Sequence, residues 1–189
     1  MRGADGAIEH AHLVDGKLEC KVIGGGRPTG ICGSGLIDII ACLLDAGVID
    51  ESGKLLENPR VVQIDENTKK AYLLADPLES GDGKPVYLSQ KDIREVQLAK
   101  GAIAAGIALL AEQMGITLEQ VEQVYIAGAF GNYMDPAGAC RIGMLPGILK
   151  DRIIPVGNAA GEGAKLALLN KEELKRAERL ARHTEFLEL

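Results

Sequence analysis

The stretch VYIAGAFGNYMDPA at Val124–Ala137 predicts the fold class of this 189-residue chain. Its first four residues are apolar or aromatic and predict a strand, which runs into Gly128 and Gly131. Asp135 followed by Pro136 then predicts a helix start, with Asp as N-cap and Pro in the first turn. A strand that passes through glycines into a helix is typical of α/β proteins, and the glycines let a ligand approach the backbone. Taken alone, close packing of the turn also explains these glycines.

The rest of the chain repeats this alternation of strands and helices. A hairpin is predicted at the start, where Asp15-Gly16 separates two alternating segments at 7–14 and 17–23. Further strands are predicted at 61–64, 71–74, 86–88 and 153–156, with a polar turn at 65–70, and helices at about 36–46, 90–114, 159–169 and 171–183. The predicted fold class is therefore α/β, a mixed sheet with flanking helices.

Short polar residues mark the predicted helix starts. Ser34 is the predicted N-cap of the helix at 36–46, and Ser89 with Asp92 resembles a capping box before the long helix. Asn158 is the predicted N-cap of the helix that follows the strand at 153–156.

Two further glycine-rich turns stand at helix starts. Gly33, Ser34 and Gly35 precede the first helix, where free N–H groups form an anion site. Gly161 and Gly163 follow the strand at 153–156, where small residues let a ligand or another backbone come close. Packing between helix and sheet explains these residues as well, so each turn alone is a weak signal.

Lys100 interrupts the apolar face of the predicted long helix. The apolar residues of that face recur three or four positions apart: Ile93, Val96, Ile103, Ile107, Leu110 and Met114. A lysine inside such a face must extend to solvent or meet an anion, because burying it unpaired is costly. Beside it, Gln97 and the small residues at 101, 104 and 108 form a face that could accept a flat ring. Together, the glycine turns and this lysine favour a nucleotide phosphate site.

Composition narrows the function classes. The net charge is −6, from 21 basic and 27 acidic residues, which argues against a nucleic-acid partner. No apolar run in the sequence reaches the roughly 18 residues that span a bilayer, and the polar start does not predict a signal peptide. We therefore expect a cytoplasmic location and no membrane partner. The four cysteines and three histidines show no metal-ligand spacing, so we expect reduced thiols and no metal site.

Five stretches resemble the C-terminal half of the ATPase domain in reductive activators of corrinoid proteins. They are MRGADGAIEH (1–10), TGICGSGLID (29–38), LSQKDIREVQLAKGAIAAGI (88–107), VYIAGAFGNYMDP (124–136) and PVGNAAGEGAKLAL (155–168). These activators belong to the acetate and sugar kinase, Hsp70 and actin (ASKHA) superfamily. The resemblance implies an RNase H-like lobe of the actin and Hsp70 type, with ATP in a cleft between two lobes. Residues 1–189 would form the C-terminal nucleotide-binding lobe, with an inserted subdomain at about 48–88.

The resemblance also implies site residues. The segment at 126–131 is similar to the superfamily's adenosine motif, although Ala127 and Ala129 flank the central glycine. Gln97 and Lys100 resemble a polar residue and a lysine that line the adenosine in Hsp70-like members. The turn at 33–35 resembles the loop near the β- and γ-phosphates, and the segment at 159–164 resembles a small-residue helix start in related kinases. The implied nucleotide contacts are Gly128, Gly131, Gln97, Lys100, Gly33, Ser34, Gly35, Gly161 and Gly163.

Three features of related proteins are not found in this sequence. Neither Asp- and Gly-rich phosphate hairpin is present, so we expect the chain to begin just after the second, with Met1 internal or added. The cysteine spacing of a [2Fe–2S] domain is also absent, so that cluster is expected in another domain, with ATP and Mg²⁺ in the full-length protein. Activators of acyl-CoA dehydratases carry a cluster cysteine at a spacing that differs from that of Cys32, so no cluster is assigned to it. We assign no catalytic residue and expect no ATPase activity from these 189 residues alone.

The expected function is the nucleotide-binding lobe of an ATP-dependent reductive activator. Such a protein would drive electron transfer from an iron–sulfur domain to a corrinoid protein, and a homodimer is a further expected association. Two alternatives stay open. One is a dimerisation or docking module whose glycines serve packing, and the other is a lobe of a small-molecule kinase of the same superfamily.

Overall fold

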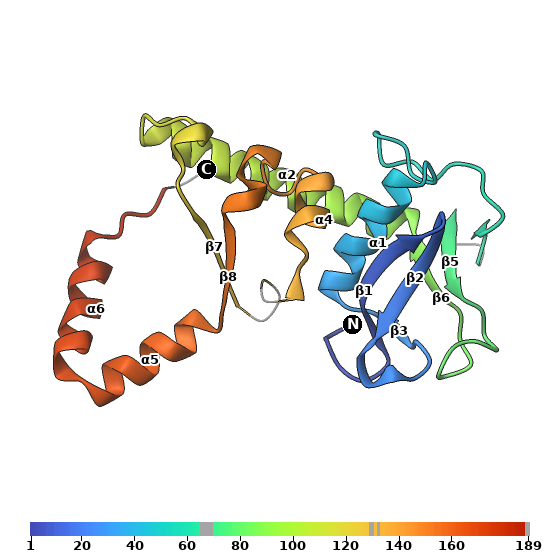
Figure 1. Cartoon of the computed structure of the whole chain (residues 1–189), viewed down its shortest axis with the longest axis horizontal. Helices are drawn as coiled ribbons and strands as arrows, with labels where there is room; N and C mark the ends of the chain where they lie inside the picture. Colours follow the sequence, from blue (N-terminus) through green and yellow to red (C-terminus); the bar gives the residue numbers. More distant parts are fainter. Residues whose placement is uncertain (65–69, 129–130, 132, 188–189) are drawn as a thin grey trace.

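The computed structural model describes residues 1–64, 70–128, 131 and 133–187. Its strands are β1 (Ala7–Val14), β2 (Lys17–Val22), β3 (Gly30–Ile31), β4 (Val61–Val62), β5 (Ala71–Ala75), β6 (Val86–Ser89), β7 (Val124–Ala127) and β8 (Ile153–Gly157). Its α-helices are α1 (Gly33–Asp45), α2 (Gln90–Gln113), α4 (Pro136–Arg141), α5 (Ala159–Leu169) and α6 (Lys171–His183). Short 3-10 turns lie at Ile23–Gly25, Leu118–Gln120 and Gly147–Arg152. This arrangement confirms the α/β fold class (Figure 1).

The strands of the described residues form three separate sheets. The first is mixed, in the order β2-β1-β3; the second is antiparallel, in the order β4-β5-β6; the third is the parallel pair β7-β8. The first two lie at one end of the molecule around α1, and the third stands on the other side of α4 (Figure 1). The strand patterns predicted all of these strands except the two-residue β3, but they did not predict this division, because strand pairing depends on partners distant in the sequence.

Local turn and cap predictions agree with the structure, with one exception. Asp15 and Gly16 both have positive φ, as a two-residue hairpin turn requires. The capping box of Ser89 and Asp92 is formed, and Asp135 and Asn158 cap α4 and α5. Most of the predicted turn at 65–70 lies outside the described residues.

The exception is Ser34, which was predicted as an N-cap. The helix α1 begins at Gly33, about three residues before the predicted start, so the N-cap is Cys32 and Ser34 lies within the first turn. The Ser34 hydroxyl is buried and donates a hydrogen bond to the carbonyl of Glu9 in β1, at 2.9 Å. A contact with a strand far away in the sequence therefore replaces the expected local cap.

The core centres on α1. Ile37, Ile39 and Leu43 are almost fully buried and pack with residues of both neighbouring sheets. Ile93 and Val96 bring the start of α2 into this core. Most of the second half of the apolar face on α2 is not buried in this core, since Ile103, Leu110 and Met114 are exposed. The 3.6-residue periodicity found this face, but beyond Val96 only Ile107 of its apolar residues packs against the core among the described residues.

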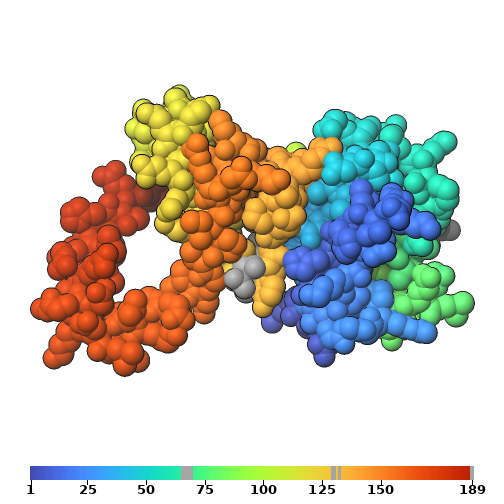
Figure 2. All heavy atoms as spheres, viewed as in Figure 1, coloured from blue at the N-terminus to red at the C-terminus, as the bar shows by residue number. Residues whose placement is uncertain are grey.

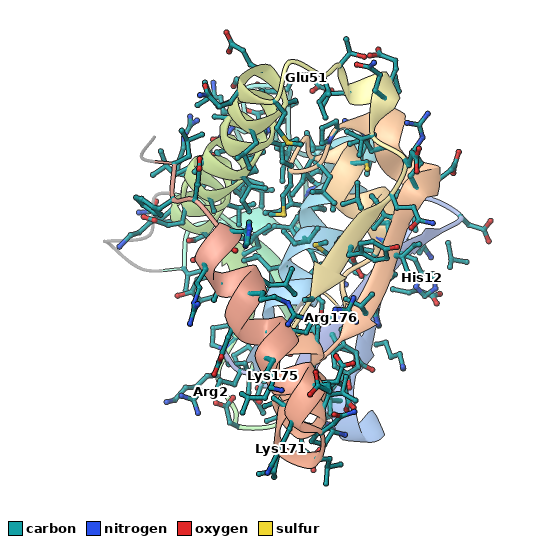
Figure 3. All side chains as sticks on the ribbon, turned by 90° about the vertical axis from the view of Figure 1, so that its left-hand side faces the viewer. Arg2, His12, Glu51, Lys171, Lys175 and Arg176 are labelled. Atoms are coloured by element: carbon teal, nitrogen blue, oxygen red, sulfur yellow. The ribbon has the colours of Figure 1, made fainter. Side chains whose placement is uncertain are left out.

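Helices α5 and α6 form an arm that stands away from the rest of the molecule. Figure 2 shows an opening between this arm and the segment around β7 and β8. No residue of β7, β8, α5 or α6 is fully buried, and each of these elements is described throughout. Lys171, Lys175 and Arg176 lie along α6 (Figure 3), where Lys175 and Arg176 pair with Glu172 and Glu173. None of the described helices is both long enough and apolar enough to cross a membrane.

Candidate functional site

The parallel strands β7 and β8 end side by side on glycines. Ala127 pairs with Gly157, and the N–H of Gly128 donates to the carbonyl of Gly157 at 2.6 Å. Gly128 has a φ of +97°, a conformation that side chains rarely adopt, and no described atom lies within 4 Å of the position a Cβ would take. Within the described part of the chain, the carboxyl end of this sheet therefore presents an open backbone at Gly128, and this end is the usual place for a ligand in a parallel sheet.

The first turn of α5 follows directly from β8. The side chain of Asn158 accepts a hydrogen bond from the N–H of Gly161 at 3.1 Å, and a Cβ on Gly161 would lie only 2.4 Å from Asn158 Nδ2. Gly163 has no described atom within 4 Å of its Cβ position. Gly161 is thus required by the helix cap itself, whereas Gly163 leaves open space beside the helix.

Gly131 has a structural reason to lack a side chain. A Cβ there would lie 2.2 Å from the Cγ2 of Ile126, so the chain folds back against β7 at this point. Ala129, which lies within the segment predicted as an adenosine motif, is outside the described residues, as are residues 130 and 132.

Gln97 and Lys100 extend from α2 toward two different neighbours. Gln97 donates to the carbonyl of Ser52 at 3.0 Å, and Lys100 Nζ donates to the carbonyl of Ile142 at 2.5 Å. Ile142 is the C-cap of α4, where helix carbonyls lack intrahelical partners and a cation is favoured. Lys100, which interrupts the apolar face of α2, therefore contacts the partial negative charge at the C-terminal end of α4.

A small cavity of about 40 Å³, which we call the Lys100 pocket, lies between α1, α2 and α4. Its polar lining comes from Gln97, Lys100 and Arg141, with Asp50 and Glu51 from the loop after α1. Of the nine residues predicted to contact a nucleotide, Gln97 and Lys100 lie together here.

The turn at 33–35 is bound to β1. A Cβ on Gly35 would lie 2.3 Å from the carbonyl oxygen of Ile8, so this glycine lets α1 approach the strand closely. Ser34 donates to Glu9, as described above, and its hydroxyl lies 3.3 Å from the Sγ of Cys32. Contact with β1 therefore explains why a serine is present at position 34 and a glycine at position 35. Gly33 is the first residue of the helix.

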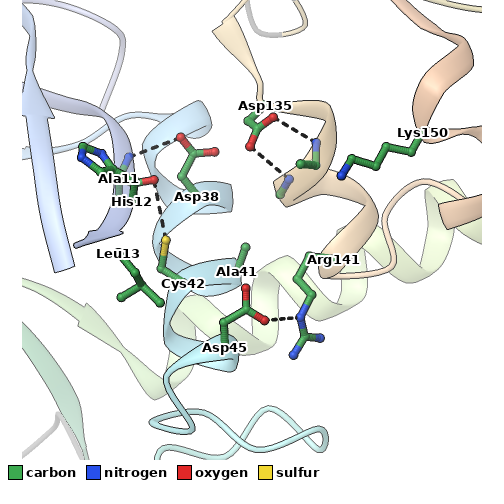
Figure 4. Close-up of a pocket in the computed structure, with 12 residues that line it drawn as sticks. Ala11, His12, Leu13, Asp38, Ala41, Cys42, Asp45, Asp135, Arg141 and Lys150 are labelled. Carbon is green, nitrogen blue, oxygen red and sulfur yellow. Dashed lines mark hydrogen bonds and ion pairs between the residues drawn. The ribbon is translucent and has the colours of Figure 1, made fainter. Parts of the chain in front are cut away.

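A larger cavity, which we call the Asp38 pocket, was not predicted from the sequence. It has a volume of about 370 Å³ and lies between β1, α1 and α4 (Figure 4). Its lining residues are Ala11, His12, Leu13, Asp38, Ala41, Cys42, Asp45, Asp135, Ala137, Gly138, Arg141 and Lys150.

Asp38 is the most unusual group of this pocket because it is a buried carboxylate with an incomplete set of partners. Its Oδ2 accepts a hydrogen bond from the Ala11 N–H at 3.3 Å and lies 3.0 Å from His10 Nδ1. Its Oδ1 has no hydrogen-bond partner among the described residues, although the residue is only 5% exposed. Burial raises the pKa of this carboxyl group, against the opposing effect of the His10 contact. The available signal was a single acid inside the apolar run LIDIIACLL at 36–44.

The cysteines do not form a reactive or metal-binding cluster. Burial raises the pKa of both Cys20 and Cys42 to about 11, so these thiols stay protonated near neutral pH. Among the described residues, no group of three or more His, Cys, Asp or Glu side chains could hold a metal ion.

Comparisons with known proteins connect this chain to corrinoid activation. The model of a protein family described as the C-terminal domain of RACo, the ASKHA domain, matches residues 1–189. A solved structure titled reductive activator for corrinoid, iron–sulfur protein superposes with a TM-score of 0.90 at 36% identity, covering 99% of this chain and 30% of that one.

Two curated relatives are similar along most of this chain. The corrinoid activation enzyme RamQ of Eubacterium limosum is 41% identical over 197 residues, covering 100% of this chain and 33% of RamQ. The [Co(II) methylated amine-specific corrinoid protein] reductase of Methanosarcina barkeri is 30% identical over 167 residues, covering 88% of this chain and 27% of the reductase. The chain thus spans about a third or less of the length of these relatives.

Proposed function

The chain belongs to the family of C-terminal ASKHA domains of RACo, and from that premise we propose that it is the nucleotide-binding lobe of an ATP-dependent reductive activator of a corrinoid protein. The observation that carries this proposal is the paired carboxyl end of β7 and β8. There, the open backbone of Gly128 lies beside Gly157, and the N-terminus of α5 follows immediately. Exposed N–H groups at a helix start after a parallel strand favour a phosphate or another anion.

The residues present fit a nucleotide at this edge. Gly128 and Gly163 leave room for a ligand next to the backbone. Gly131 and Gly161 are required by local packing, which keeps the turns in shape and is compatible with nearby binding. We further propose that residues 48–88, which hold β4, β5 and β6, form an inserted subdomain from which α2 carries Gln97 and Lys100 to the adenosine.

In the reaction, this chain would act through a conformational change. Nucleotide binding at the lobe, and later hydrolysis, would close it against a second lobe and bring the activator and its corrinoid partner together. The electron for Co(II) would come from a [2Fe–2S] cluster held outside these residues, and Mg²⁺ would be bound with ATP in the full-length protein. We also propose that the protein forms a homodimer.

The test is a calorimetric titration of the full-length protein with ADP and with a non-hydrolysable ATP analogue. Lys100→Ala should weaken binding by up to about tenfold, because a charge-assisted hydrogen bond to a ligand is worth about 1.5–3 kcal/mol and the displaced contact with Ile142 offsets part of it. Lys175→Ala is the matched control, since Lys175 is exposed on α6 and pairs only with Glu172 among the described residues. Thermal unfolding of both variants separates lost binding from the lost contact with Ile142.

Two outcomes would contradict the proposal. An absence of binding heat in the intact protein would favour a docking module without a nucleotide role. A phosphorylated small-molecule product would instead favour a kinase of the same superfamily.

A further inference from the structure

A cavity of about 570 Å³ lies between β2 of the first sheet and β5 of the second, and we call it the Tyr72 cavity. Residues 16–20 form one wall, and residues 58–60, 72 and 74 form the other. Figure 1 shows β2 and β5 next to each other at this end of the molecule. The second wall belongs to the region 48–88, which we propose to be an inserted subdomain. Ligand cavities are common where two such units meet, and their volumes are roughly 300–1,000 Å³.

The lining of the Tyr72 cavity includes apolar side chains from both sheets. Leu18 and Cys20 alternate with the more exposed residues of β2, and Tyr72 and Leu74 belong to β5. Tyr72 is part of the core cluster, and the other three side chains pack against that cluster. The apolar surface inside the cavity is therefore fixed by the core on both sides, so the cavity does not need to form when a ligand arrives.

Tyr72 brings a hydroxyl group into this apolar lining. The residue is only 7% exposed, yet its hydroxyl makes no hydrogen bond to the described residues. Burial raises the pKa of Tyr72, against the opposing effect of Arg60 and together with that of Cys20. Arg60 and Cys20 both line the cavity, which places the groups that act on the hydroxyl on the cavity side. The hydroxyl stays protonated near neutral pH and is a donor that lacks an acceptor, although a buried tyrosine usually finds one.

The guanidinium of Arg60 is held beside this hydroxyl with donors to spare. Its Nη1 donates to the carbonyls of Leu73 and Leu74, at 3.2 and 3.4 Å, which fixes the side chain against β5. The described residues form no ion pair with Arg60 and no hydrogen bond with its remaining N–H groups. A guanidinium fixed in this way is already oriented for a further acceptor.

The charges of the cavity favour an anion. Lys17 and Arg60 line it, and neither forms an ion pair with the described residues. Glu19 is the acidic residue of the described lining, and its carboxylate lies 3.7 Å from His12 Nε2, which is not part of the lining. The cavity therefore has an excess of positive charge and of donors, which attracts a negatively charged ligand.

We propose that the Tyr72 cavity binds a small organic acid, with its carboxylate on Arg60, its apolar body against Leu18 and Leu74, and an acceptor oxygen at the Tyr72 hydroxyl. A planar carboxylate matches the parallel N–H donors of a guanidinium. A small molecule is favoured over a protein partner, because the unpartnered donor belongs to a residue that is 7% exposed and lies between two sheets. The proposal does not depend on nucleotide binding.

Calorimetric titration of the full-length protein with benzoate and with hexanoate tests the proposal, and benzyl alcohol is the neutral probe. We expect one or both acids to bind with a Kd of about 1 mM or lower, and the alcohol to bind at least about tenfold more weakly. Tyr72→Phe removes only the hydroxyl and should weaken binding of the acid about two- to tenfold. Tyr87→Phe is the matched control, because Tyr87 lies on the neighbouring strand β6 and does not line the cavity.

Arg60→Gln tests the charge and should weaken binding of the acid about tenfold or more. Arg27→Gln is the matched control, because the Arg27 guanidinium donates to the carbonyl of Leu78 outside the cavity. Melting temperatures without ligand show whether each variant is folded, and Tyr72→Phe decides alone if Arg60→Gln is not. An absence of binding by both acids, or unchanged affinity in either folded variant, would overturn the proposal. Equal affinity for benzyl alcohol would overturn the choice of an anion.

Discussion

Helices α1 and α5 both consist mostly of apolar residues, yet one is the centre of the core and the other has no buried residue. In α1, Leu43 is 1% exposed and belongs to a core cluster that includes residues of two sheets, while in α5 Leu168 and Leu169 are 86% and 83% exposed. The difference lies in the surroundings rather than in the helices, because α1 has partners on several sides and α5 contacts mainly α6 (Figure 1). An apolar helix sequence therefore predicts that the helix packs against a partner. In the described residues, α1 has such partners and α5 has few.

Leucine-to-alanine substitutions should give the largest difference in the free energy of unfolding between α1 and α5. Leu43→Ala should lower the free energy of unfolding by about 2–5 kcal/mol, because it leaves a cavity in the core. Leu168→Ala should change it by no more than about 0.5 kcal/mol, as is usual for exposed side chains. Chemical denaturation followed by circular dichroism measures both. A comparable loss in the two variants would show that α5 is buried in solution.

Glycine substitutions should give a smaller contrast with opposite signs. Gly35→Ala should destabilise the protein by about 1–3 kcal/mol, because its Cβ would meet the backbone carbonyl of Ile8. Gly163→Ala should stabilise it by about 0.5–1 kcal/mol, since this helix position has open space around it. Melting temperatures check both signs. Should Gly163→Ala weaken nucleotide binding while it raises stability, the open space beside α5 serves the ligand.

The smallest expected effect concerns the charge inside the core region. Because burial raises the pKa of Asp38 in the folded chain, this residue contributes stability below its ordinary pKa of about 3.9, and that contribution is lost as the pH rises through the folded-state pKa. Asp38→Asn should therefore flatten the dependence of the melting temperature on pH above about pH 4 and raise the melting temperature at neutral pH. Besides its burial, the groups that act on the pKa of this carboxyl are His10, the N–H of Ala11 and Asp135.

Asp45→Asn serves as the control for that experiment. It removes a carboxylate from the same helix, but one that is exposed and paired with Arg141. A pH profile of Asp38→Asn that runs parallel to the wild-type profile would contradict the expected cause.

The sequence predicted those features whose determinants are local. The hairpin depends on Asp15-Gly16, and the starts of α2, α4 and α5 depend on caps within three residues of the helix. Ser34 shows the limit, because its hydroxyl bonds to Glu9, 25 residues away, and not to its own helix. The split into three sheets and the exposed end of α2 were missed for the same reason.

The candidate site was predictable to a similar extent. The open glycine at position 128 could be inferred from a strand that ends before a helix, and the unusual lysine from the pattern of α2. Asp38 is the last residue of the stretch TGICGSGLID, but no role was predicted for it, and its importance comes from the positions of β1 and α4 around it. Its isolation in an apolar run was visible, but the partners that make it unusual were not.

The contact between Lys100 and Ile142 changes how affinity at this lysine should be understood. The ammonium is already engaged with the end of α4, so an incoming anion would not meet a free charge. Binding would be a competition in which one partner of Lys100 replaces another, and only the difference between the two would appear as affinity. Residues that determine the geometry at the end of α4 would then influence the affinity for the ligand without contacting it.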